Sequence, residues 1–186
     1  MIHKQKVILL IIILIFVHSF AFAQNARLAG FFITYAKEDL LVSMNVKSAF
    51  REKIKKAVLS GAPASFSFII SLHHDRNFWF DEKIAEFEIT HTIKYNSLKK
   101  KFVIKRPWKE NLPLVTESFE EAQKLMTEIH GLNIIPLQNL EHGKLYRVKA
   151  KAELSRLTLP FYLHYIFFFV SLWDFETDWY TLDFIY

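Results

Sequence analysis

The chain has 186 residues, of which 24 are basic and 19 acidic, and its formal net charge is +5. It contains no cysteine, which excludes disulfides, thiol chemistry and cysteine-ligated metals. Its stability must therefore come from an apolar core, and the 19 phenylalanines predict a strongly aromatic one.

The first 23 residues have the pattern of a secretory signal peptide. A short basic start precedes an apolar run over 7–17, and the small-x-small pattern that a signal peptidase recognises ends at Ala23. We expect cleavage between Ala23 and Gln24, which leaves a single β-rich domain over 24–186. The alternative is an uncleaved anchor, although the apolar run is shorter than the about 20 residues of a spanning helix.

Alternation of apolar and polar side chains predicts antiparallel strands, each with one buried and one exposed face. Residues 26–48 predict a hairpin around the polar Lys37–Asp39. In the clearest later strand, over 84–95, His91 shares the inward face with apolar residues. The other strands are predicted over 64–74, 101–106, 145–154 and 179–186.

Two helices are predicted from apolar residues that lie three and four positions apart. The first covers 48–61, with Ser48 as its N-cap. The second covers 118–131, where Ser118 and Glu121 form a capping box and the final glycine ends the helix.

The stretches 107–117 and 132–143 are expected to be connectors between these elements. The predicted fold class is therefore mostly β or α+β. It is an antiparallel sheet or a two-layer β-sandwich, with two to three helices covering part of it.

Basic residues gather on two parts of the predicted sheet. If the two parts are neighbours, the solvent side of the sheet is a cationic plate that could contact anionic lipid headgroups or an acidic partner. The alternative is a solvated face that only discourages edge pairing. The members are Lys94, Lys99, Lys100, Lys101, Lys105 and Arg106 on one hairpin, and Arg147, Lys149 and Lys151 on a later strand.

Residues 161–173 form an apolar, aromatic stretch that is too short to span a bilayer. The composition fits a buried core helix or strand, and it also fits a patch that dips into a membrane surface or a partner. The residues of such a patch are Phe161, Tyr165, Phe167, Phe168, Phe169 and Trp173.

No motif in the chain predicts catalysis, a cofactor or a metal site. His73 and His74 are neighbours on a strand and point to opposite faces, so they cannot chelate one ion. The acids Asp174, Glu176 and Asp178 alternate, but the stretch lacks the glycine and the final glutamate of a calcium loop. The chain also lacks Gly-x-Ser-x-Gly, His-Glu-x-x-His and a phosphate-binding glycine run. We therefore expect a non-enzymatic protein without a cofactor.

Several stretches resemble a known family. They are residues 78–104, which include Trp79-Phe80-Asp81-Glu82, the second predicted helix, the strand over 145–154 and the closing Asp178-Trp179 pair. On these residues the chain resembles the secreted bacterial family called domain of unknown function 4390. The resemblance implies an exported, envelope-associated protein of one domain, with an accessory link to a sensor kinase system. It transfers no catalytic residue.

The leading hypothesis is a non-enzymatic periplasmic protein that contacts the inner-membrane surface or a membrane protein. Export excludes nucleic acid as an ordinary partner and leaves anionic lipid, polysaccharide or phosphate. An enzyme of unrecognised type is a second class. A small outer-membrane β-barrel is a third, because alternate residues from Tyr180 to Tyr186 are apolar; two capped helices in so short a chain weigh against it.

Overall fold

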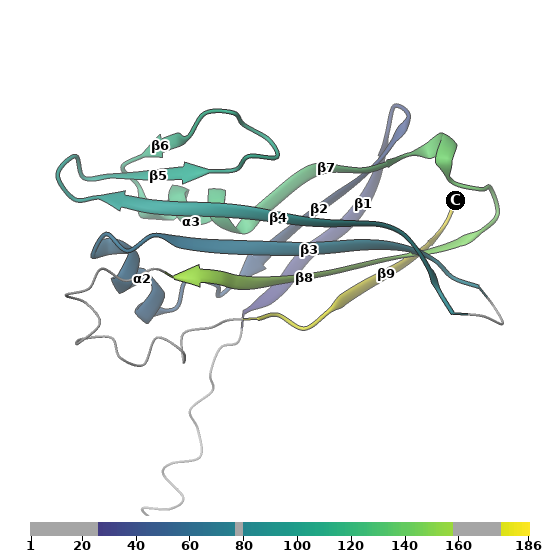
Figure 1. Cartoon of the computed structure of the whole chain (residues 1–186), viewed down its shortest axis with the longest axis horizontal. Helices are drawn as coiled ribbons and strands as arrows, with labels where there is room; N and C mark the ends of the chain where they lie inside the picture. Colours follow the sequence, from purple (N-terminus) through teal and green to yellow (C-terminus); the bar gives the residue numbers. More distant parts are fainter. Residues whose placement is uncertain (1–25, 77–79, 158–175) are drawn as a thin grey trace, which may run out of the picture.

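The computed structural model describes residues 26–76, 80–157 and 176–186, and it places their strands in two antiparallel sheets. The small sheet has the strand order β1-β2-β7 and the large sheet the order β6-β5-β4-β3-β8-β9. Figure 1 shows the small sheet running obliquely across the large one. The strands are β1 (Arg27–Ala36), β2 (Asp39–Lys47), β3 (Ala64–His74), β4 (Glu82–Asn96), β5 (Lys101–Lys105), β6 (Leu114–Thr116), β7 (Glu128–Pro136), β8 (Leu145–Leu157) and β9 (Tyr180–Ile185).

Two α-helices and one short 3-10 helix complete the described part of the chain. They are α2 (Glu52–Leu59), α3 (Phe119–Thr127) and η1 (Leu137–Asn139). The predicted fold class, a mostly β protein with antiparallel sheets and two to three helices, is confirmed. No helix in the described residues is long and apolar enough to cross a membrane.

The centre of the large sheet is the strand triplet β4-β3-β8, and its inner face is apolar because side chains alternate. Phe66, Phe68 and other inward residues of β3 are fully buried. On β8 the residue paired with Phe68 is Ala152, and Ala150 is paired with Ile70. Small side chains on β8 therefore leave room for the large side chains of β3 on the inner face.

The small sheet supplies the other half of the core. Leu40, Val42, Met44 and Val46 alternate along β2 and are at most 5% exposed. They belong to one hydrophobic cluster with the inner face of the large sheet. The hairpin predicted around Lys37–Asp39 is confirmed, since β1 and β2 pair up to Ala36 and Asp39.

One side of the sandwich is closed by aromatic contacts between β1 and β9, the edge strands of the two sheets. The ring of Phe31 lies 5.2 Å from that of Tyr180, and Tyr35 lies 6.5 Å from Phe184 and 6.2 Å from Tyr186. The predicted terminal strand is thus confirmed as β9. Its first aromatics remain half exposed, and Trp179 lies beneath the Lys151 ammonium instead of covering the core.

The start of the first helix was predicted wrongly. Ser48 has a φ of +59° and does not cap α2, which begins four residues later after Arg51, whose side chain makes no capping hydrogen bond. Ala49 follows Ser48 and is fully buried. The chain therefore passes through the core before the helix starts.

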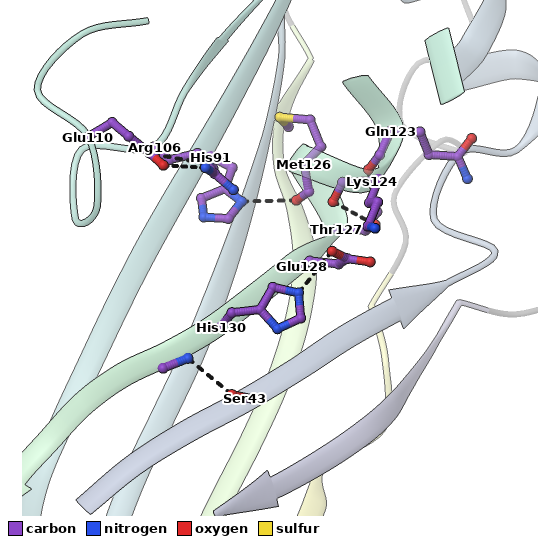
Figure 2. A network of polar contacts seen from close by, with 11 residues as sticks. Ser43, His91, Arg106, Glu110, Gln123, Lys124, Met126, Thr127, Glu128 and His130 are labelled. Atoms are coloured by element: carbon purple, nitrogen blue, oxygen red, sulfur yellow. Dashed lines mark hydrogen bonds and ion pairs between the residues drawn. The ribbon is translucent and has the colours of Figure 1, made fainter. Parts of the chain in front are cut away.

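The end of the second helix was also predicted wrongly. α3 ends at Thr127 and β7 follows at once, so much of the predicted connector over 132–143 is strand. Gly131, with a φ of +66°, lies inside β7 where the register against β2 shifts. Its N–H donates to the Ser43 hydroxyl at 3.0 Å, a bond drawn in Figure 2. The glycine therefore serves a β-bulge and not a helix terminus.

Candidate interaction surface

The β4–β5 hairpin ends in a tight turn that presents an apolar side chain to solvent. The N–H of Lys99 donates to the Asn96 side-chain oxygen at 3.0 Å, and Lys100 has a φ of +52°. Asparagine stabilises such turns by this bond. At the tip Leu98 is 94% exposed. Figure 1 shows this turn at one end of the long axis, the end that also carries α2.

The outer side of this hairpin carries a group of cations that we call the lysine face. Pairing between β4 and β5 puts Lys94 opposite Val103, and pairing between β5 and β6 puts Val103 opposite Val115. Because strand residues alternate, Val103 has a lysine two positions before and after it on the same face. The lysine face consists of Lys94, Lys99, Lys100, Lys101 and Lys105.

The lysine face carries more positive charge than its acidic neighbours balance. Lys101 forms an ion pair with Glu117 at 3.3 Å, and both side chains are well exposed. Such exposed pairs contribute little to stability and are screened by salt. Among the described residues, the other four lysines of the face have no ion-pair partner. The face therefore attracts anions.

Two depressions lie on the lysine face. One, of about 500 Å³, is lined by Lys94 and Lys105 together with Leu98 and the turn that follows α2. The other, of about 560 Å³, is lined by Lys99 and Lys101. Asn96 and Val103 line both depressions, which therefore share a wall.

The condition for a cationic plate, that the two basic groups lie on neighbouring strands, is not met, because β3 lies between β4 and β8. Arg106 does not belong to the exposed cations of the hairpin. It is 8% exposed and donates to the Glu110 carboxylate at 2.9 Å, a pair seen in Figure 2. Of the nine predicted contact residues, the five hairpin lysines therefore remain as the candidate contact surface.

The three predicted contact residues of β8, Arg147, Lys149 and Lys151, are held in ion pairs. Arg147 donates to both oxygens of Asp183 at 2.7 and 2.9 Å, and it lies 3.0 Å from Asp75 and 3.2 Å from Asp81. Hydrogen bonding from this guanidinium holds the pKa of Asp183 below its usual range. These ion pairs connect β8 to β9 and to both ends of the β3–β4 connection, so Arg147 has a structural role.

The other two predicted contact residues of β8, Lys149 and Lys151, are balanced in the same way. Lys151 lies 2.7 Å from Glu176 and 3.2 Å from Glu153, and these hydrogen bonds raise the pKa of its ammonium. Lys149 lies 4.0 Å from Asp81. Three of the nine predicted contact residues are therefore on β8 and neutralised.

His91 occupies the core between the large sheet and α3. Its Nδ1 lies 3.0 Å from the carbonyl oxygen of Met126, as Figure 2 shows, and its Nε2 lies 2.7 Å from Trp108 Nε1. An indole nitrogen can only donate, so Nε2 accepts and Nδ1 carries the proton. Burial lowers the pKa of His91 to about 4. The imidazole is neutral, and both of its ring nitrogens are hydrogen-bonded. Trp108 was not identified from the sequence as a partner of His91, because Trp108 lies outside the predicted strands.

His73, His74 and His91 have different surroundings and do not meet at one site. His91 pairs with Phe66, and His73 bonds to Ser71 at 3.0 Å while His74 packs against Tyr146 on the inner face. The described residues contain no group of three or more histidines, aspartates or glutamates that could hold a metal ion.

The remaining predicted residues lie outside the described part of the chain. They are Ala23 and Gln24 of the cleavage site and Phe161, Tyr165, Phe167, Phe168, Phe169 and Trp173 of the apolar patch. The points where 158–175 joins the sheet are described. β8 ends at Leu157, which pairs with Ala64, and Ala64 pairs with Ile93 of β4. The chain therefore leaves β8 at the end of the sheet that carries the lysine face.

Comparison with known proteins identifies the family of the chain. A search of the curated proteins found no match, and a search of the solved structures found none either. The family model described as Domain of unknown function (DUF4390) matches residues 23–183. The chain therefore belongs to the DUF4390 family.

Proposed function

We propose that this protein is a non-enzymatic interaction module of the cell envelope that binds the anionic surface of the inner membrane, on its periplasmic side, through the lysine face. The observation that carries the proposal is the group of lysines without acidic partners around the exposed Leu98. A lysine near an anionic membrane surface contributes about 1 kcal/mol. The exposed leucine adds an apolar contact with the interface.

The distribution of charge along β4 supports an end-on orientation. At one end of this strand Glu82 is paired with Arg76 and Glu86 with Lys83, whereas Lys94, toward the turn at the other end, has no ion-pair partner among the described residues. An anionic surface therefore attracts the lysine end more strongly than the other end. The apolar stretch predicted as an interaction patch joins the sheet at the lysine end, through Leu157 and through Glu176, which bridges to Glu153.

Binding of this kind is reversible and sensitive to salt, because lysine attraction to a surface falls off within a Debye length. A few lysines and one leucine give marginal binding by themselves. An accessory role beside a membrane protein, such as the sensor kinase system implied by the family resemblance, fits a module that reaches the membrane with one end. Crosslinking in cells would identify such a partner.

The test is flotation of the purified protein with vesicles. Neutral vesicles and vesicles containing phosphatidylglycerol are compared over a series of salt concentrations. The quadruple variant Lys94→Gln, Lys99→Gln, Lys100→Gln, Lys105→Gln removes the unpaired cations. The matched control replaces four exposed lysines elsewhere, Lys37, Lys47, Lys124 and Lys144, by glutamine.

We expect the wild-type protein and the control to float with anionic vesicles at low salt and to be released as salt rises. The quadruple variant should lose most of this binding at equal net charge. If the two variants bind equally, the lysine face is not the contact surface. If the wild-type protein stays unbound under all conditions, the proposed membrane binding is wrong.

A further inference from the structure

The two depressions take in four of the five cations of the lysine face, two at each, and Lys100 lines neither of them. Lys94 and Lys105 line one depression, and Lys99 and Lys101 line the other. Val103, which is apolar, lies between them and lines both. The surface therefore has two cationic sites separated by a short uncharged wall.

We infer that the lysine face binds a lipid that carries two phosphate groups, with one phosphate in each depression. The inference rests on the proposed function and adds the class of lipid. An ammonium group binds phosphate as a point charge without strict geometry. Two lysines at each depression match two phosphates, with Lys101 exchanging its exposed partner Glu117 for the phosphate, and an uncharged linker such as glycerol crosses Val103.

The spacing of the lysines suits such a ligand. Residues on a strand rise by about 3.4 Å each, so the Cα atoms of Lys101 and Lys105 are about 14 Å apart. Lys94 pairs with Val103 and is therefore the diagonal neighbour of both lysines. The flexible lysine stems can bring the ammonium groups closer together than the Cα atoms.

Exposed apolar residues beside the depressions favour a lipid over a soluble diphosphate as the ligand. Leu98 lines the first depression and is 94% exposed, while Val115 lines the second and is 57% exposed. A soluble diphosphate would leave both side chains in water. A lipid places its acyl chains and the glycerol region against them, which removes apolar area from water.

Joining two phosphates in one molecule increases affinity beyond the effect of surface charge. Once the first phosphate is bound, the second binds from within the same molecule at a high effective concentration. A singly charged lipid gains the surface attraction but not this second step. The two kinds of lipid are therefore distinguishable at equal charge density.

The experiment compares two sets of vesicles in flotation with the purified protein. One set contains diphosphatidylglycerol, and the other contains twice the molar amount of phosphatidylglycerol, so the number of phosphates is matched. The double variants Lys94→Gln, Lys105→Gln and Lys99→Gln, Lys101→Gln each remove one cationic pair. The control Lys37→Gln, Lys144→Gln removes two exposed lysines outside the lysine face.

We expect the wild-type protein and the control to bind the diphosphatidylglycerol vesicles at least about tenfold more tightly, because both phosphates are held. Each double variant should bind the two vesicle sets equally. Equal wild-type binding to both sets overturns this inference and leaves the proposed function intact. Binding to neither set overturns both. If one of the double variants still binds the diphosphatidylglycerol vesicles more tightly, the inference is also overturned, because one depression is then enough to distinguish the two lipids.

Discussion

His91 is a fully buried titratable side chain with both ring nitrogens hydrogen-bonded. Its pKa is lowered from 6.5 to about 4, chiefly by burial; the nearby Arg106 contributes to the lowering, while Glu110 acts in the opposite direction. The hydrogen bond to Met126 also opposes the shift without cancelling it. The core therefore holds a neutral imidazole that links the large sheet to the last turn of α3.

The stability of the protein should fall with acidification through this histidine. Between pH 6.5 and about 4 the unfolded chain binds a proton that the folded state excludes. The contribution of the neutral His91 to the free energy of unfolding is therefore complete above pH 6.5. It is lost as the pH falls toward 4, and the free energy of unfolding then decreases by as much as about 3 kcal/mol. Urea unfolding at several pH values, followed by tryptophan fluorescence, measures this loss.

Two variants separate this effect from other titrations. His91→Gln keeps a donor and an acceptor but does not titrate, so its free energy of unfolding should depend less on pH over this window. His130→Gln, at an exposed histidine, is the matched control. If His91→Gln and the wild-type protein show the same pH dependence, the buried neutral histidine does not contribute.

The N-terminus of α3 shows a network that extends the predicted capping box. The Ser118 hydroxyl accepts from the N–H of Glu121 at 3.1 Å, as predicted. The second half of the box runs through Thr116, whose hydroxyl accepts from the N–H of Ser118 at 3.1 Å and donates to the Glu121 carboxylate. Thr116 belongs to β6, so the cap fastens the helix to the large sheet.

Removing this cap should destabilise the protein measurably. Ser118→Ala leaves the N–H of Glu121 without its acceptor, and the expected cost is about 1 kcal/mol. Ser60→Ala, which removes an exposed hydroxyl bonded to the carbonyl of Lys56 in α2, is the control and should change the free energy of unfolding by less than about 0.5 kcal/mol. Equal effects in urea unfolding would contradict a specific role for the cap.

Sequence reasoning succeeded for elements whose periodicity is regular. β4 and β8 alternate without interruption at their centres, and His91 of β4 lies on the buried face as predicted, whereas Ile69 interrupts the alternation of β3, whose Ser67 and Ser71 are also buried. It failed at β7, because the bulge at Gly131 breaks the alternation and α3 runs into the strand without a linker. A glycine near the end of a helical pattern indicates a helix terminus just as well as a bulge.

The candidate site was only partly predictable for a related reason. Alternation assigns Lys94 and Lys149 to outward faces, but it does not tell which strands are neighbours. That information comes from the order β4-β3-β8. The acidic partners of Arg147 lie on other elements, far from it in sequence, so its neutralisation also follows only from the fold.

At the level of the complete fold, the lysine face and η1 lie at opposite ends of the long axis (Figure 1). An end-on contact with a membrane therefore brings Leu98 to the surface and keeps Gln138 in water. Because the chain has no cysteine, each position can be labelled alone. The orientation is thus open to direct measurement.

We expect an environment-sensitive fluorophore on Leu98→Cys to shift to shorter wavelength when anionic vesicles are added. The same label on Gln138→Cys should show no shift, because this position stays in water. High salt should reverse the shift at position 98, since charge screening weakens the binding. Equal shifts at both positions would contradict the end-on orientation.

The contact between β1 and β9 also has a consequence for the order in which parts of the chain fold. Phe31 and Tyr35 emerge early in synthesis, and their partners Tyr180, Phe184 and Tyr186 emerge more than a hundred residues later. Contacts between such distant residues form late and slow the folding of β proteins. A chain that is delivered from its N-terminus therefore keeps the edge of β1 open until residues 180–186 arrive. Its first strand is the part that a chaperone would have to protect.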